Sequence, residues 1–100
     1  MDTFTALADS TRRHIVETLA GGESAFGDLA DRFEMSRPAV SQLLSVLREA
    51  GLVSVRNDEQ RRNYLLNSDG LGEIEGWLEI VREFLNGRLD ELERVLQEDQ

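Results

Sequence analysis

Cysteine and lysine are absent from the 100-residue sequence, and proline occurs once. Without cysteine the chain has no disulfides and no thiolate ligands for a metal. No apolar run approaches the roughly 18 residues that a membrane-spanning helix needs. Nor does the chain open with the basic and then apolar segments of a secretory signal peptide. We therefore expect a cytoplasmic protein that has no membrane partner.

Residues with the chemistry for catalysis or metal binding are also scarce. The one histidine, His14, has no cysteine near it that could complete a metal cluster. The sequence contains no phosphate-binding glycine loop and no nucleophile elbow. The many acids of the last third are typical of the solvated face of a helix. We expect no catalytic residue, no metal ligand and no cofactor, and so a protein that is not an enzyme.

Charge is distributed unevenly along the chain, whose formal net charge is −9. Residues 1–34 carry three arginines and seven acids (−4), and residues 67–100 carry three arginines and ten acids (−7). Residues 35–66 carry five arginines and three acids, which gives +2. The local field at a contact surface governs binding to phosphates more than the total charge does. Only the middle third is therefore suited to nucleic acid.

The first third predicts a short helical segment followed by a longer helix. Residues 4–8 form an apolar patch of one or two helical turns. Asp9 or Ser10 can cap the next helix, which has apolar residues four apart on one face and ends at Gly21.

Two amphipathic helices joined by a tight turn are predicted over residues 24–50. Ser24 and Ser36 are the expected N-caps, and Pro38 lies in the first turn of the second helix, where no backbone donor is needed. Each helix has apolar residues at i, i+3, i+4 and i+7. These are Phe26, Leu29, Ala30 and Phe33, and then Val40, Leu43, Leu44 and Leu47. Helices joined by so short a turn cross steeply, which is the geometry of a helix-turn-helix.

The hydrophobic period then changes from 3.6 to 2. Two β-prone runs flank a polar connection at residues 57–62, which predicts a hairpin over residues 52–66. A hairpin directly after the second helix is a wing. The expected fold class is therefore mainly α with a small β-hairpin, a winged helix-turn-helix in a single domain over residues 1–100.

A long amphipathic helix is predicted over residues 69–97, with Ser68 or Asp69 as its N-cap. Its apolar residues alternate steps of three and four: Leu71, Ile74, Leu78, Val81, Leu85, Leu89, Leu92 and Leu96. Because the core of the body is already formed, an identical helix from a second chain is the economical partner. We therefore expect a homodimer formed through the terminal helices. Its expected interface residues are Phe4, Leu7, Leu71, Ile74, Leu78, Val81 and Leu85.

Three segments of the sequence resemble the ArsR-type family of bacterial repressors. They are residues 9–13 (DSTRR), residues 36–53 (SRPAVSQLLSVLREAGLV), which are similar to the family's recognition-helix signature, and residues 63–67 (NYLLN). The resemblance implies a dimeric DNA-binding repressor with a winged helix-turn-helix. It also implies a member without metal sensing, since residues 25–29 hold no cysteine and the last helix holds no histidine. Leu43 stands where the family often has histidine, so a DNA contact made there is not expected.

The polar face of the second helix of the pair is expected to contact double-stranded DNA. Its residues are Ser36, Arg37, Pro38, Ser41, Gln42 and Ser45. Gln42 can pair with adenine, and Arg37 with guanine or a phosphate. Arg56, Arg61 and Arg62 of the wing are candidate phosphate or minor-groove contacts. Arg12 and Arg13 are further candidates for a phosphate or an acidic partner.

Two other classes of function remain open on the sequence. The net negative charge fits a winged-helix module that binds another protein and has no affinity for DNA. Trp77, which lies beside the apolar seam of the last helix, fits core or dimer packing, and also a sensor whose small-molecule effector would bind between the dimer helices. The sequence does not identify such an effector.

Overall fold

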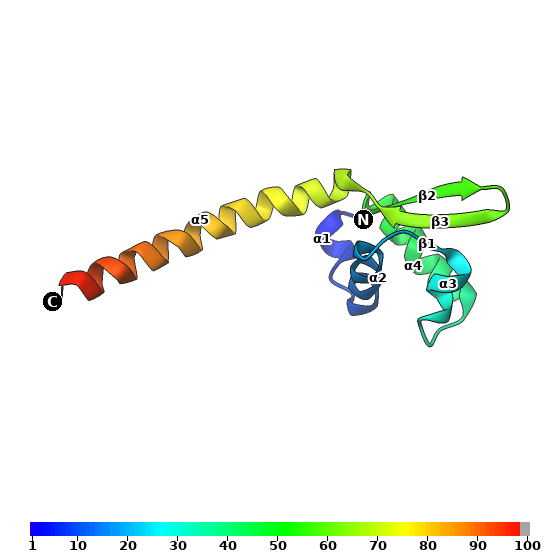
Figure 1. The fold of residues 1–100 in the computed structure, drawn as a ribbon, viewed down its shortest axis with the longest axis horizontal. Helices are drawn as coiled ribbons and strands as arrows, with labels where there is room; N and C mark the ends of the chain where they lie inside the picture. Colours follow the sequence, from blue (N-terminus) through cyan, green and yellow to red (C-terminus); the bar gives the residue numbers. More distant parts are fainter. Residues whose placement is uncertain (99–100) are drawn as a thin grey trace.

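The computed structural model of the chain describes residues 1–98. The helices are α1 (Thr3–Ala6), α2 (Ser10–Ala20), α3 (Phe26–Asp31), α4 (Arg37–Glu49) and α5 (Ser68–Glu98), and the strands are β1 (Ser24–Ala25), β2 (Val53–Asp58) and β3 (Arg61–Leu66). Figure 1 shows the first four helices and the sheet gathered in one body, from which α5 extends. The molecule measures 67 × 26 × 23 Å along its principal axes. The predicted fold class, mainly helical with a small antiparallel sheet, is confirmed.

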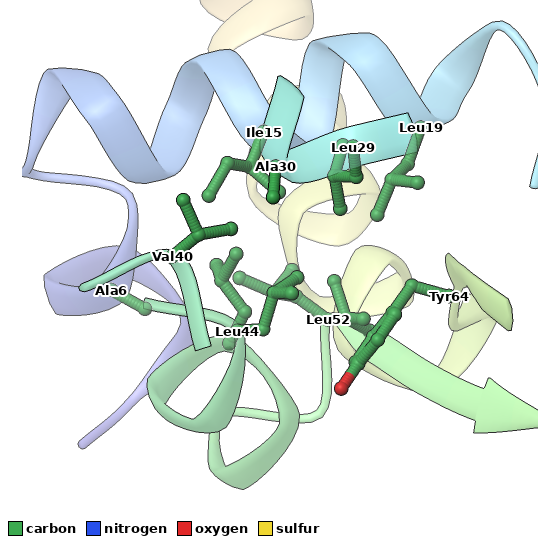
Figure 2. Close-up of a cluster of buried hydrophobic side chains, with 11 residues drawn as sticks. Ala6, Ile15, Leu19, Leu29, Ala30, Val40, Leu44, Leu52 and Tyr64 are labelled. Atoms are coloured by element: carbon green, nitrogen blue, oxygen red, sulfur yellow. The ribbon is translucent and has the colours of Figure 1, made fainter. Parts of the chain in front are cut away.

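One hydrophobic core joins the four short helices to the sheet. Its buried members are Ala6, Ile15, Leu19, Leu29, Ala30, Val40, Leu44, Leu47, Leu52, Val53 and Tyr64. Figure 2 shows these side chains converging from opposite sides, with the ring of Tyr64 at the margin of the cluster. Burial of each large apolar side chain contributes about 1.5–3 kcal/mol. The periodic stripes of α2 and α4 therefore fix how the body is assembled.

The sheet has three antiparallel strands in the order β1-β3-β2, one more than the predicted hairpin. Ser24 and Ala25 pair with Tyr64 and Asn63 of β3. The prediction that Ser24 caps the next helix is therefore wrong. Ala25 is the N-cap residue and its side chain makes no capping hydrogen bond. Because extended pairing continues through Ala25, α3 cannot begin before Phe26, and it is only six residues long.

The turn of the wing is tighter than the polar run of residues 57–62 suggests. The ladder between β2 and β3 continues to Asp58 and Arg61, so only Glu59 and Gln60 connect the two strands. Glu59 has φ 56°, in the left-handed region of backbone conformation that residues other than glycine and asparagine seldom adopt. Two-residue hairpin turns require a positive φ, so strand pairing imposes this conformation on glutamate.

Arg12, a candidate for contact with a phosphate or an acidic partner, makes hydrogen bonds within the chain. Its guanidinium donates hydrogen bonds to the backbone oxygens of Ala6 at 2.7 Å and Thr5 at 3.5 Å. A cation is favourable beside the carbonyl groups at a helix C-terminus, so this side chain fastens α2 to α1. Arg13 is exposed. Asp9 caps α2 as predicted, accepting a hydrogen bond from the N–H of Arg12 at 2.9 Å.

α5 begins against the end of α4. The side chain of Asn67 accepts a hydrogen bond from the N–H of Asp69 at 3.0 Å, so the predicted caps Ser68 and Asp69 are wrong. The N–H of Gly70 donates to the carbonyl of Gly51 at 2.9 Å. A Cβ on Gly70 would lie 2.6 Å from the carbonyl carbon of Gly51. Only glycine permits this approach, which determines where α5 leaves the body.

Alanine in place of Gly70 is expected to lower the free energy of unfolding by about 1–3 kcal/mol, since backbone must move to admit the methyl group. Gly72→Ala is the matched control. A Cβ there meets nothing within 4 Å, and alanine should raise the free energy of unfolding by up to about 1 kcal/mol. Urea unfolding of both variants measures the difference. Equal effects of the two substitutions would contradict the close approach.

Candidate nucleic-acid interface

α4 has an inner face that is buried and an outer face that is open. Val40, Leu44 and Leu47 are buried in the core. They belong to the same cluster as Leu29 of α3, as the two apolar stripes predict. Leu43 is half-buried at the edge of that core. Burial of one stripe fixes the rotation of α4 about its own axis, and hence which side chains face outward.

The outward face of α4 carries the polar residues that the sequence singles out. Ser36, Arg37, Pro38, Gln42 and Ser45 are exposed, and Ser41 is half-buried. These side chains are short or planar, and several can both donate and accept hydrogen bonds. A continuous helical face of this kind can approach the edges of base pairs in a major groove.

The N-terminus of α4 is organised by its cap and by an ion pair. The Oγ of Ser36 accepts a hydrogen bond from the N–H of Ala39 at 3.3 Å, which confirms the predicted cap. Pro38 lies in the first turn, where its missing N–H costs nothing. One guanidinium nitrogen of Arg37 lies 3.7 Å from a carboxylate oxygen of Asp31, the last residue of α3.

The wing presents its arginines on both faces of the hairpin. Consecutive residues of a strand point to opposite faces, so Arg61 and Arg62 diverge. The guanidinium of Arg62 lies 5.7 Å from the centroid of the Tyr64 ring on the same face as that buried side chain. Arg61 and Arg56 share the opposite face by register. The guanidinium of Arg56 is hydrogen-bonded to the carboxylate of Glu23.

The residues expected at a dimer interface are placed in two groups. Leu7, Leu71 and Ile74 are partly buried and pack against the core of their own chain. Further along α5, Val81 is half-buried, and Leu78 and Leu85 are exposed.

Phe4 of α1 also lies at this surface. Its ring packs edge-on against that of Trp77, with 5.8 Å between the centroids, and both residues remain about half exposed. The two aromatic side chains join α1 and α5 into one apolar surface.

Sequence reasoning missed a second apolar row on α5. Ile80 and Phe84 are 68% and 62% exposed, more than any residue of the predicted seam. With Trp77 they follow the same steps of three and four as the seam, one residue position away from it. That spacing is the signal that could have found them. The apolar surface of α5 is therefore wider than one seam.

His14 has an ordinary packing role. Its ring lies edge-on to that of Phe33, with the centroids 5.1 Å apart. Within residues 1–98, no group of three or more histidine, aspartate or glutamate side chains is placed to hold a metal ion. No helix in this part of the chain has both the length and the apolar character needed to cross a membrane.

Known proteins are similar to this chain in both sequence and fold. Residues 9–55 match the family described as bacterial regulatory protein, arsR family. The HTH-type transcriptional regulator Rv2034 of Mycobacterium tuberculosis is 54% identical over 69 residues, which are 69% of this chain and 64% of that protein. The transcriptional repressor SdpR of Bacillus subtilis is 35% identical over 77 residues, 77% of this chain and 86% of that protein. The match to Rv2034 thus spans less than two thirds of its length.

The similarity to known proteins extends to the three-dimensional fold. The crystal structure of an ArsR family transcriptional regulator, RHA00566, superposes with a TM-score of 0.72 at 26% identity. The superposition covers 84% of this chain and 87% of that one. The fold described here is therefore that of a known group of winged helix-turn-helix regulators.

Replacing Ser36 by alanine is expected to cost about 1 kcal/mol of stability, because the N–H of Ala39 loses its capping acceptor. Ser36→Asp keeps an acceptor and should restore the stability. Thermal unfolding of both variants measures this, with the wild type as reference. Equal loss in the two variants would show that the cap does not stabilise α4.

Proposed function

The chain belongs to the arsR family of bacterial regulatory proteins and is a DNA-binding transcriptional regulator, and we propose that it acts as a homodimeric repressor of a pseudo-palindromic operator. The family is one of transcription regulators and not of enzymes. Repression is proposed because SdpR is named as a transcriptional repressor. Because the match covers only part of Rv2034, what this protein does as a whole is also a proposal.

The observation that carries the proposal is the open polar face of α4. In our assignment this face enters the major groove, and Gln42 reads an adenine there through its paired donor and acceptor. Arg37 contacts guanine or a neighbouring phosphate, while the exposed serines supply contacts that discriminate less between bases. Residues 24–50 are thus assigned to the helix-turn-helix, and residues 52–66 to the wing.

The wing is assigned to the DNA backbone or the adjacent minor groove. Arg61 and Arg62 directly follow the two-residue turn, and both are exposed. The acidic helix α5 must lie away from phosphate, because its charge would repel DNA. Figure 1 supports this arrangement, since the tip of the wing and the far end of α5 lie at opposite ends of the molecule.

The exposed apolar surface of α5 supports dimerisation through residues 69–97. Beyond Trp77, whose ring packs against Phe4 of α1, the helix extends away from the body of the molecule (Figure 1). Its exposed apolar side chains are Trp77, Leu78, Ile80, Phe84, Leu85, Leu89, Leu92, Val95 and Leu96. An apolar surface of this size on a small protein indicates an interface. A second copy would cover it and would place two α4 helices on one face of the duplex, about one helical turn apart.

The experiment that tests the proposal starts from a library of random duplex DNA. Repeated selection on the purified protein should enrich a two-fold symmetric sequence, bound with a strong dependence on salt. A reporter placed behind that sequence should be repressed by the protein. Binding that does not saturate, from a protein shown to be dimeric, would favour a module that binds another protein. Activation of the reporter would contradict the proposed repression but not the proposed DNA binding.

Within the proposed DNA-binding surface, Gln42→Ala and Arg62→Ala are expected to change DNA binding in different ways. Loss of the glutamine amide should relax the preference for one base by about 1–3 kcal/mol. Loss of a phosphate-contacting guanidinium should weaken binding to all sequences and reduce the salt slope by about one. Fluorescence anisotropy on the selected duplex and on single-base variants distinguishes the two. Identical losses on every duplex for both variants would contradict these roles.

For the dimer, Leu85→Glu is expected to shift the protein toward monomer, since a carboxylate would be buried at the contact between copies. Asn86→Glu adds the same charge one residue further along, on the exposed polar side of α5, and should leave the dimer intact. Sedimentation velocity over a range of concentrations measures both. A wild-type monomer at high concentration would rule out the proposed interface.

A further inference from the structure

Two arginines of the proposed DNA-binding surface are held by carboxylates of the same chain. Arg37 at the start of α4 is paired with Asp31, and Arg56 of β2 is hydrogen-bonded to Glu23. Both acids precede α4 in the sequence. Asp31 ends α3, and Glu23 stands immediately before β1.

Both ion pairs are open to solvent. The side chains of Arg37 and Asp31 are 65% and 74% exposed, and those of Arg56 and Glu23 are 57% and 40% exposed. An exposed ion pair is weak, and salt screens it. A DNA phosphate, which is an anion on a densely charged polymer, can therefore take over the guanidinium group.

We propose that Asp31 and Glu23 are negative determinants of DNA binding, which compete with phosphates for Arg37 and Arg56. A phosphate that binds either arginine competes with the carboxylate for the guanidinium group, and it brings that carboxylate close to the nucleic acid. The two acids thus lower the affinity for any duplex. Only a site that also makes base contacts with α4 then stays occupied at cellular salt. This inference rests on the proposed function, because it requires the arginines to meet DNA.

The test uses the full chain and a duplex of random sequence. Asp31→Asn removes the competing charge and keeps the shape of the side chain, so the affinity for the duplex should rise about two- to five-fold. Glu34→Gln is the matched control. It makes the same change of charge in the turn before α4, at an exposed residue that forms no ion pair within residues 1–98. Its effect should be clearly smaller.

A double-mutant cycle separates competition from the general field of the protein. In an Arg37→Ala background, Asp31→Asn should raise the affinity no more than Glu34→Gln does, because the arginine it competes for is gone. Glu23→Gln should likewise lose its effect in an Arg56→Ala background. Thermal midpoints confirm that each variant is folded, which is expected for exposed side chains.

Three results would overturn the inference. An equal gain with and without the arginine would show that only the general charge matters. Weaker DNA binding by Asp31→Asn would show that the acid positions its arginine for DNA. Failure of the wild type to bind any duplex, at any salt concentration, would refute the proposed function itself, and it is distinguished from the first two by the wild-type titration alone.

Discussion

Burial of the inner stripe of α4 is the interaction on which the rest of the structure depends. Val40, Leu44 and Leu47 are packed in a core that also holds Leu29 of α3 and Tyr64 of β3. Because a helix has 3.6 residues per turn, fixing one stripe fixes the opposite face as well. The same contacts that stabilise the body therefore present the polar face of α4 to solvent. The core also ties that face to the sheet, and hence to the wing.

The periodic helices could be predicted from the sequence, because each carries its signal within a few turns. The stripes of α4 and α5 and the caps at Asp9 and Ser36 are of this kind. What could not be predicted depends on residues distant in the chain. β1 is only two residues long and exists because β3 pairs with it, and the contact of Gly70 with Gly51 arises only when α5 meets the end of α4.

The features of the candidate site also fall into two groups, those that follow from the local sequence and those that depend on the folded surface. Which residues line the outer face of α4 follows from periodicity alone, so all the predicted members from Ser36 to Ser45 are found at the surface or at its edge. The state of the arginines does not follow from periodicity. Arg12 binds backbone carbonyls, and Arg37 and Arg56 are paired with acids. A count of arginines in the middle third overstates the charge that is free to meet DNA, because pairing is a property of the folded surface.

The central claim is that the outer face of α4 meets DNA while the far end of α5 does not. Amide chemical shifts in NMR spectra, recorded as a selected duplex is added, test it most directly. The largest changes are predicted at residues 36–45 and 56–62, with little change beyond residue 85. Large changes confined to the far part of α5, with α4 unaffected, would contradict this account.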